Sequence, residues 1–149
     1  MDFLKSNSVL YIRLDEAFSP VKKTSVQIFK NKWFSKFAKE EGILDKELCE
    51  AVHDAERGLI DADYGGGVIK QRIARPNEGK SGGFRSIILY RREDKAFFVF
   101  GFPKNDKDNI KTDEVRWFKK MAKSTFELSE DQLEKLIKTG DFRPVKCNE

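Results

Sequence analysis

The chain has 149 residues, a formal net charge of +4, 39% hydrophobic residues and 36% charged residues. This length fits one domain with a sizeable core, and the hydrophobic fraction, which includes 13 phenylalanines, excludes an intrinsically disordered chain. No apolar run approaches the length of a membrane span, and the charged N-terminal segment does not have the pattern of a signal peptide.

The start of the chain predicts an extension followed by a strand. Residues 1–24 hold a short apolar run that Pro20 interrupts, which predicts a peripheral N-terminal extension. Residues 25–29 alternate apolar and polar side chains, as a half-buried strand does.

Two helices are predicted next. Residues 31–41 place apolar side chains on one helical stripe, and Gly42 ends that helix. Residues 45–59 predict a second helix that Asp45 can cap, with an apolar stripe made of Leu44, Leu48, Val52, Ala55 and Leu59.

The middle of the chain predicts a loop and three strands. Residues 61–67, DADYGGG, predict a loop because glycine permits positive φ. Extended segments follow at residues 68–74, 85–91 and 96–102, and the turn sequence REDK joins the last two into a hairpin.

The end of the chain predicts two more helices. Ser129 and Gln132 have the spacing of a capping box at the start of the last helix, which Gly140 ends. The helix before it covers residues 112–123, with inward-facing Val115, Phe118, Met121 and Ala122. The element order predicts an α+β fold in which helices cover one sheet.

The cysteines and the single histidine exclude several kinds of site. Cys49 and Cys147 are far apart, neither has a metal-type spacing, and His53 stands alone. We therefore expect no metal, no cofactor and no disulfide scaffold, and a protein that works in a reducing cytoplasm.

The positive charge is concentrated in one segment. Residues 70–85 contain a single anion, Glu78, and five cations, so this segment carries the whole excess of +4. Such a patch favours an acidic partner such as nucleic acid. The five cations are Lys70, Arg72, Arg75, Lys80 and Arg85.

The letters Gly79-Lys80-Ser81 match the end of a phosphate-binding P-loop, but the rest of that motif is missing. The first glycine of the motif would stand at position 74, which is Ala74. Two glycines and a strand-like run follow Ser81, where a P-loop requires a helix. The sequence therefore predicts a basic, glycine-rich connection between strands.

Strand periodicity predicts a cationic sheet face. Lys70 and Arg72 are two residues apart and share one face, whereas Ile69 and Ile73 share the other. One face would then bind an anionic partner while the opposite face carries the core. The alternative is a merely solvated sheet face beside a mobile loop.

With these residues placed, the chain resembles the RelE/HigB family of type II toxins over about residues 25–128. The stretches that carry the resemblance are WFSKFAKEEGI, GLIDADYGGGVIKQRIARPNEGKSGGFRSIILY and FFVFGFPKNDKDNI. Residues 1–24 fall outside it, and residues 129–149 form a C-terminal helix and tail.

The resemblance implies a small α+β fold with two N-terminal helices against an antiparallel sheet. It implies a toxin that cleaves messenger RNA in the ribosomal A site. It also implies a cognate antitoxin, a HigA-like helix-turn-helix protein, through which the complex binds operator DNA. We expect no membrane partner.

Metal-independent RNA cleavage through the 2′-hydroxyl needs a base, an acid and charge stabilisation on the phosphate. By family position, Arg85 is the phosphate clamp, and Lys70, Lys80, Lys104 and Asn105 are the other candidate catalytic residues. The candidate RNA-binding residues are Arg72, Arg75, Ser81 and Phe84. Phe84, Phe100 and Phe102 are candidates to stack on a base.

The general base stays open. Some family members carry an arginine and a later tyrosine after the last strand, where this chain has Asn105 and then Asn109-Ile110-Lys111. His53 is not a candidate, and an arginine cannot act as a base. A lysine can transfer a proton when neighbouring cations lower its pKa.

Two other functions remain open. The same cationic face would serve a non-catalytic RNA- or ribosome-binding inhibitor. A ParE-like gyrase inhibitor would share the fold without nuclease residues, but the clustered cations and the GKSGGFR sequence argue against it.

Overall fold

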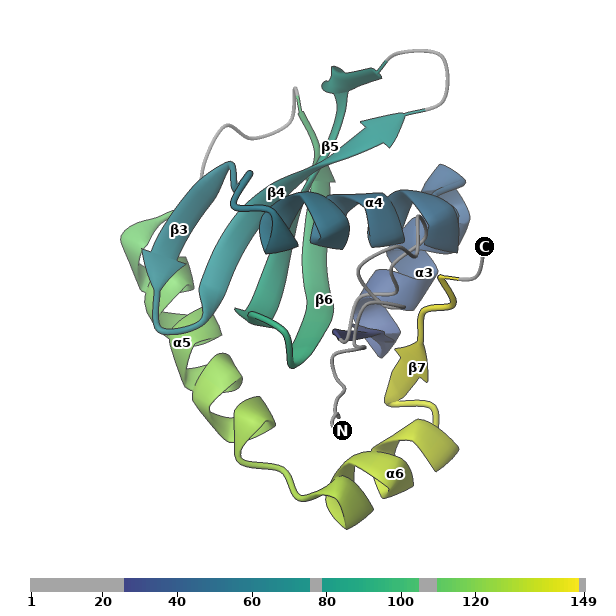
Figure 1. Ribbon diagram of the computed structural model, residues 1–149, viewed down its shortest axis with the longest axis vertical. Helices are drawn as coiled ribbons and strands as arrows, with labels where there is room; N and C mark the ends of the chain where they lie inside the picture. The colour runs from purple at the N-terminus through teal and green to yellow at the C-terminus, as the bar shows by residue number, and fades with distance from the viewer. Residues whose placement is uncertain (1–25, 76–78, 105–109, 148–149) are drawn as a thin grey trace, which may run out of the picture.

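The computed structural model describes residues 26–75, 79–104 and 110–147, with the backbone alone for residues 79–82. Within these residues it contains four helices and a six-stranded sheet with the order β3-β4-β5-β6-β2-β7 (Figure 1). The predicted α+β fold is therefore confirmed, and the expected N-terminal extension lies outside the described residues.

The sheet is antiparallel apart from one pair, in which β2 runs parallel to β6. The predicted loop at residues 61–67 is instead mostly strand β3, and β5 begins well before the expected residue 85. The short strand β7 was not predicted. The strands are β2 Gln27–Asn31, β3 Ala62–Gly65, β4 Val68–Arg75, β5 Gly79–Arg91, β6 Lys95–Pro103 and β7 Phe142–Pro144.

The end of the first helix and both ends of the last lie where their capping residues predict. Gly42 follows the first helix with φ of 71°, and Ser129 and Gln132 form the reciprocal hydrogen bonds of a capping box, at 2.9 and 3.1 Å. Gly140, with φ of 85°, follows the last helix. The helices are α3 Lys32–Glu41, α4 Asp45–Glu56, α5 Thr112–Phe126 and α6 Glu130–Lys138.

The start and end of α4 differ from the prediction. Leu44 precedes the helix, and its N–H donates to Glu47 Oε1 at 2.7 Å, so Asp45 is not the cap. The helix stops at Glu56, which leaves Leu44 and Leu59 exposed by 61% and 59%. The buried stripe of α4 therefore includes the other three predicted positions, and Leu44 and Leu59 lie outside it.

Each face of the sheet carries its own core, which corrects the expectation of one apolar face and one cationic face. Ile69, Ile73 and Ile88 pack with α3 and α4 on one face, and α4 crosses in front of the central strands in Figure 1. Val68 and Ile87 pack with α5 and α6 on the other face. Lys70 and Arg72 of β4 and Arg85 of β5 share this second face, beyond the apolar residues that α5 covers.

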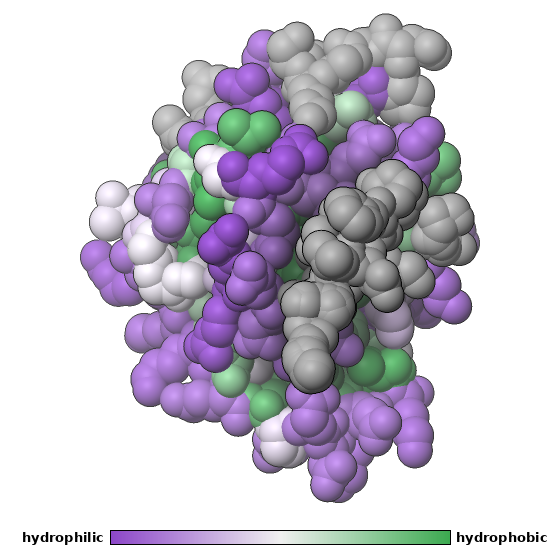
Figure 2. All heavy atoms as spheres, in the orientation of Figure 1, coloured by the Kyte–Doolittle hydropathy of each residue, from purple (hydrophilic) through white to green (hydrophobic). Residues whose placement is uncertain are grey.

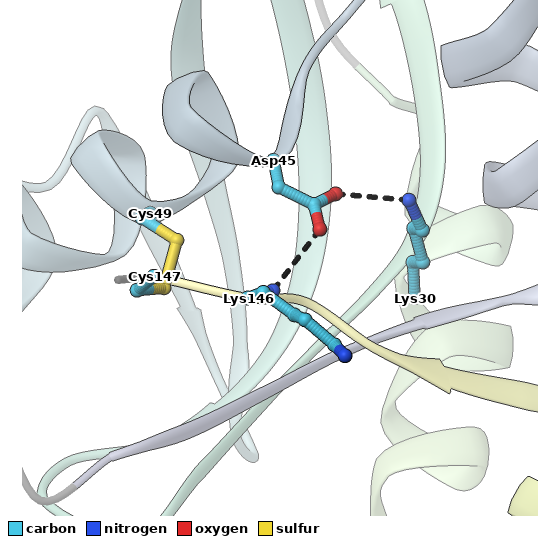
Figure 3. The surroundings of a disulfide bond; sticks show 5 residues. All are labelled: Lys30, Asp45, Cys49, Lys146 and Cys147. Atoms are coloured by element: carbon cyan, nitrogen blue, oxygen red, sulfur yellow. Dashed lines mark hydrogen bonds and ion pairs between the residues drawn. A yellow bond between two sulfur atoms is a disulfide. The ribbon is translucent and has the colours of Figure 1, made fainter. Parts of the chain in front are cut away.

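A disulfide ties the C-terminal segment to α4, which corrects the expectation that the two cysteines are unconnected. Cys49 and Cys147 are bonded, with their Cα atoms 5.8 Å apart (Figure 3). Beside them, Asp45 Oδ1 accepts a hydrogen bond from Lys30 Nζ and Asp45 Oδ2 accepts one from Lys146 N, each at 3.0 Å. Val145 N donates to Ile28 O at 2.8 Å, which continues the attachment of the segment to β2.

The surface on the α4 side is mainly hydrophilic, with scattered apolar side chains (Figure 2). The large apolar residues exposed in the described part of the chain lie on different elements: Trp33, Leu44, Leu59 and Trp117. None of the described helices is long and apolar enough to cross a membrane.

Candidate functional site

Strand register brings three predicted cations together on one face of the sheet. Arg72 on β4 is directly opposite Arg85 on β5, and Lys70 on β4 is opposite Ile87. Because side chains two residues apart share a face, Lys70, Arg72 and Arg85 all lie on the α5 side. The sequence places Lys70 and Arg72 there, and the pairing of the strands adds Arg85.

A carboxylate that the sequence analysis did not single out lies among these cations. Asp61, in the connection between α4 and β3, has Oδ1 at 3.3 Å from Arg72 Nε. Its Oδ2 is 3.5 Å from Lys70 Nζ and 3.7 Å from Arg85 Nε. We call Asp61, Lys70, Arg72 and Arg85 the Asp61 cluster.

Most of the Asp61 cluster is buried. The Lys70 and Arg85 side chains are each 10% exposed and that of Asp61 is 15% exposed, whereas that of Arg72 is 48% exposed. Among the described residues, Asp61 Oδ2 and Arg85 Nη1 are buried without a hydrogen-bond partner. Such atoms cost stability, so their presence marks a place where structure is not optimised for folding alone.

Gln71 fixes the segment that carries Asp61. Its Nε2 donates to the carbonyl oxygens of Ala51 at 2.9 Å and Leu59 at 2.8 Å, and its Oε1 accepts from Asp61 N at 3.0 Å. Gln71 is almost fully buried, with 3% exposed. The amide therefore anchors the backbone of Asp61 to α4 and β4.

A pocket of about 320 Å³ opens beside the cluster. Arg72 is the cation of the cluster that borders this pocket. A group bound there would lie next to the exposed guanidinium and the Asp61 carboxylate. The lining residues are Asp54, Leu59, Ile60, Asp61, Gln71 and Arg72.

Tyr64 on β3 lies near the cluster and was also missed. Burial, and then the negative charge of Asp61, raise the pKa of the Tyr64 hydroxyl above its ordinary value. The phenol is therefore protonated at neutral pH, so it can donate a hydrogen bond but is not a ready base. Its Oη is buried without a partner among the described residues.

Two glycines of the predicted loops have structural reasons to be glycine. A Cβ on Gly83 would lie 2.0 Å from Ile73 O, because β4 and β5 approach closely at a bulge. Gly66, with φ of 63°, lies under Lys119 of α5, whose Cγ would be 3.1 Å from an added Cβ. At both positions the absent side chain lets a neighbouring protein segment approach closely.

Phe84 does not lie where base stacking requires. It is 1% exposed and packs in the α3–α4 core, with its ring centroid 5.7 Å from that of Phe37. Arg75 places its guanidinium 4.5 Å from the centre of the Phe84 ring. We therefore withdraw Phe84 as an RNA-stacking residue, because its inward strand position buries it, and Phe102, 5% exposed, is withdrawn for the same reason.

The other residues considered as candidates either lie away from the Asp61 cluster or belong to the part of the chain that the structure does not describe. Lys104 is exposed just after β6, and its N–H donates to Gly83 O at 3.2 Å. The side chains of Lys80 and Ser81, and all of Asn105, lie outside the described residues. His53 is on α4, which packs on the opposite face of the sheet from the cluster.

Asp61 and Gln71 gave only weak signals in the sequence. Asp61 belongs to a polar, glycine-rich stretch in which acidic residues are ordinary, and Gln71 alternates with cations along β4. In the described residues, no three His, Cys, Asp or Glu side chains form a group that could hold a metal ion.

Comparison with known protein families gives a match to a toxin family. The model of the RelE toxin of the RelE/RelB toxin–antitoxin system matches residues 26–145. The comparison with curated proteins found no match. The matched range covers β2 to β7, including every member of the Asp61 cluster. The chain therefore belongs to the RelE family of toxins, whose members pair with a cognate antitoxin and generally inhibit translation.

Proposed function

We propose that this toxin is an endoribonuclease that cuts messenger RNA in the ribosomal A site and so arrests growth. Because the proposed substrate is a message on the ribosome, the toxin acts in the cytoplasm, and the reaction needs no metal. The observation that carries the proposal is the Asp61 cluster, in which two buried cations and one exposed arginine share a strand-paired surface. Such a surface can hold a phosphate and keep water away from it.

The proposed reaction is an internal displacement at phosphorus. The 2′-oxygen attacks the adjacent phosphate, the bond from phosphorus to the 5′-oxygen breaks, and a 2′,3′-cyclic phosphate forms. The 2′-hydroxyl loses its proton to a base, and an acid protonates the 5′-oxygen. Arg85 and Lys70 stabilise the charge that develops on the phosphate, and Arg72 holds the flanking backbone.

The residues outside the cluster complete the proposal. A lysine is the candidate for proton transfer, and the choice lies among Lys70, Lys80 and Lys104. Asn105 would act beside Lys104. Arg75 and Ser81 would position the RNA.

The proposed partner is a HigA-like antitoxin with a helix-turn-helix domain. A basic surface that binds RNA would not itself read operator sequence, so contact with operator DNA would be made through the antitoxin. Covering the Asp61 cluster would suffice to silence the toxin.

One observation favours a second function, a non-catalytic inhibitor that binds RNA or the ribosome. Within the described residues, the Asp61 cluster contains no histidine, and its nearby tyrosine is held protonated. Binding would use the same cations without proton transfer.

Primer extension on a reporter message in a translating extract separates these functions. We expect codon-positioned cuts with the wild type and none with Arg85→Ala. The matched control is Arg91→Ala, which removes an arginine from the same strand whose side chain is 59% exposed and lies against Asp94. This control should cut as the wild type does.

The other outcomes are also informative. Blocked translation without cuts would replace the nuclease by the binding function. No effect on translation, together with inhibition in a supercoiling assay, would favour a ParE-like inhibitor. Cutting that survives Arg85→Ala would remove Arg85 from the site.

A further inference from the structure

We infer that Asp61 is a positioning residue for the cleavage reaction, which holds Lys70, Arg72 and Arg85 in the arrangement that receives the scissile phosphate. The inference rests on the proposed nuclease function and adds to it a residue that the sequence motifs do not indicate. Asp61 acts through the cations and need not touch the RNA.

The geometry of the contacts supports this role. Asp61 meets both arginines at Nε, the inner nitrogen of the guanidinium group. Contact at Nε sets the direction in which a guanidinium group points and leaves its outer edge for another ligand. The Arg85 contact is 3.7 Å long, beyond hydrogen-bond range, and Nη1 of that residue has no partner among the described residues. Arg85 is therefore oriented without being saturated.

The balance of charge supports it as well. Three cations lie 3.3 to 3.7 Å from the Asp61 carboxylate, so the four residues of the cluster carry a net charge of +2. Without Asp61, the buried Lys70 and Arg85 would be like charges in a poorly solvated place, and they would move apart or toward water. With Asp61 present they stay close, and the remaining charge still attracts a phosphate.

The backbone that carries the Asp61 carboxylate is itself held in place. Gln71 accepts the N–H of Asp61 at 3.0 Å and is bound in turn to the carbonyl oxygens of Ala51 and Leu59. The residue that contacts all three cations is thus anchored to α4 and β4 through Gln71. These hydrogen bonds of Gln71 support Asp61, and a precisely arranged site requires such support.

Removing the charge of Asp61 should affect RNA binding and cleavage in opposite directions, and this makes its role testable. A carboxylate repels the phosphates of RNA, so removing its charge should by itself strengthen binding. If Asp61 positions the cations, the same change should slow cleavage of bound RNA. A fall in maximal rate without weaker binding is therefore the signature of positioning.

The test is single-turnover cleavage on ribosomes programmed with a defined message, over a range of toxin concentrations. For Asp61→Asn we expect the maximal rate to fall about 10- to 100-fold, with a half-saturating concentration equal to or below that of the wild type. The control is Asp63→Asn on β3, an exposed residue whose one hydrogen bond among the described residues is a local one from Gly65 N at 2.9 Å. It removes the same charge nearby and should leave the rate unchanged.

Asp61→Glu is the second variant, because it keeps the charge and shifts its place. It should recover part of the rate that Asp61→Asn loses, and thermal unfolding of each variant checks the fold. If Asp61→Asn does not fold, Asp61→Glu decides alone: a lower maximal rate with unchanged half-saturation supports the inference, and a wild-type rate overturns it.

The remaining outcomes separate this inference from the function on which it rests. The positioning role alone is overturned if Asp61→Asn cuts as fast as Asp63→Asn. It is also overturned if Asp61→Asn loses activity only because it binds more weakly. A wild type that never cuts overturns the nuclease function and the positioning role together.

Discussion

Asp45, the first residue of α4, and Asp61, which directly precedes β3, are both aspartates, but their carboxylates have different partners. Asp45 has one partner for each oxygen, Lys30 Nζ and Lys146 N, both at 3.0 Å (Figure 3). Asp61 is surrounded by three cations at 3.3 to 3.7 Å, and its buried Oδ2 makes no hydrogen bond among the described residues.

The difference is the one expected between a carboxylate that serves folding and the positioning residue proposed above. A carboxylate that serves folding is expected to satisfy its oxygens, as Asp45 does while it ties β2 to the C-terminal segment. A carboxylate with a buried oxygen that makes no hydrogen bond costs stability, and the excess of positive charge around it is available for a ligand.

The largest effect is expected from Arg85→Lys. Lysine keeps the charge but cannot bind a phosphate with two parallel hydrogen bonds, so the cleavage rate should fall about 100-fold. Single-turnover cleavage on programmed ribosomes measures it. Arg91→Lys, on the same strand, should keep the wild-type rate, and an active Arg85→Lys would show that charge alone suffices.

Breaking the Cys49–Cys147 disulfide should lower the stability of the fold and leave the cleavage rate unchanged. Because the bond closes a long loop, its loss should lower the free energy of unfolding by about 2–4 kcal/mol. Denaturant unfolding with and without a reductant gives the value. The double variant Cys49→Ser/Cys147→Ser should be insensitive to the reductant; a wild type equally insensitive would mean that the bond contributes nothing.

Asp45→Asn should lower stability by about 1–2 kcal/mol, because it weakens a partly buried ion pair with Lys30. The cleavage rate should not change, in contrast to Asp61→Asn. Glu127→Gln is the control, since its pair with Lys123 has side chains 76% and 66% exposed and should contribute almost nothing. Slower cleavage by a folded Asp45→Asn would contradict the division between the two aspartates.

The smallest effect on stability is expected from Tyr64→Phe. The Tyr64 hydroxyl is buried without a partner among the described residues. Its removal should therefore lower the free energy of unfolding by less than about 0.5 kcal/mol, or should raise it. Denaturant unfolding tests this. A loss above about 1 kcal/mol would mean that the hydroxyl has a partner in solution.

Local signals in the sequence predict much of the fold. Gly42, Ser129 with Gln132, and Gly140 mark helix ends because capping depends on residues next to one another in the chain. The β5–β6 hairpin follows from its turn sequence for the same reason. The family resemblance then places the cations of β4 and β5 in one site.

Contacts between distant segments could not be predicted in this way. Strand β7 has three residues, and it exists because β2 lies beside it. The disulfide depends on the same docking of the C-terminal segment, which no cysteine spacing reveals. Asp61 joins its cations only after β3, β4 and β5 have paired, so composition indicates the cations but not the carboxylate between them.

The central claim is that the Asp61 cluster cleaves RNA through the 2′-hydroxyl. The most direct measurement is the chemistry of the new RNA ends after treatment of programmed ribosomes with wild type and Arg85→Ala. We expect a 2′,3′-cyclic phosphate on the upstream fragment with the wild type and no fragment with Arg85→Ala. Intact message on ribosomes that the wild type has stalled, or fragments of equal yield from both proteins, would contradict the claim.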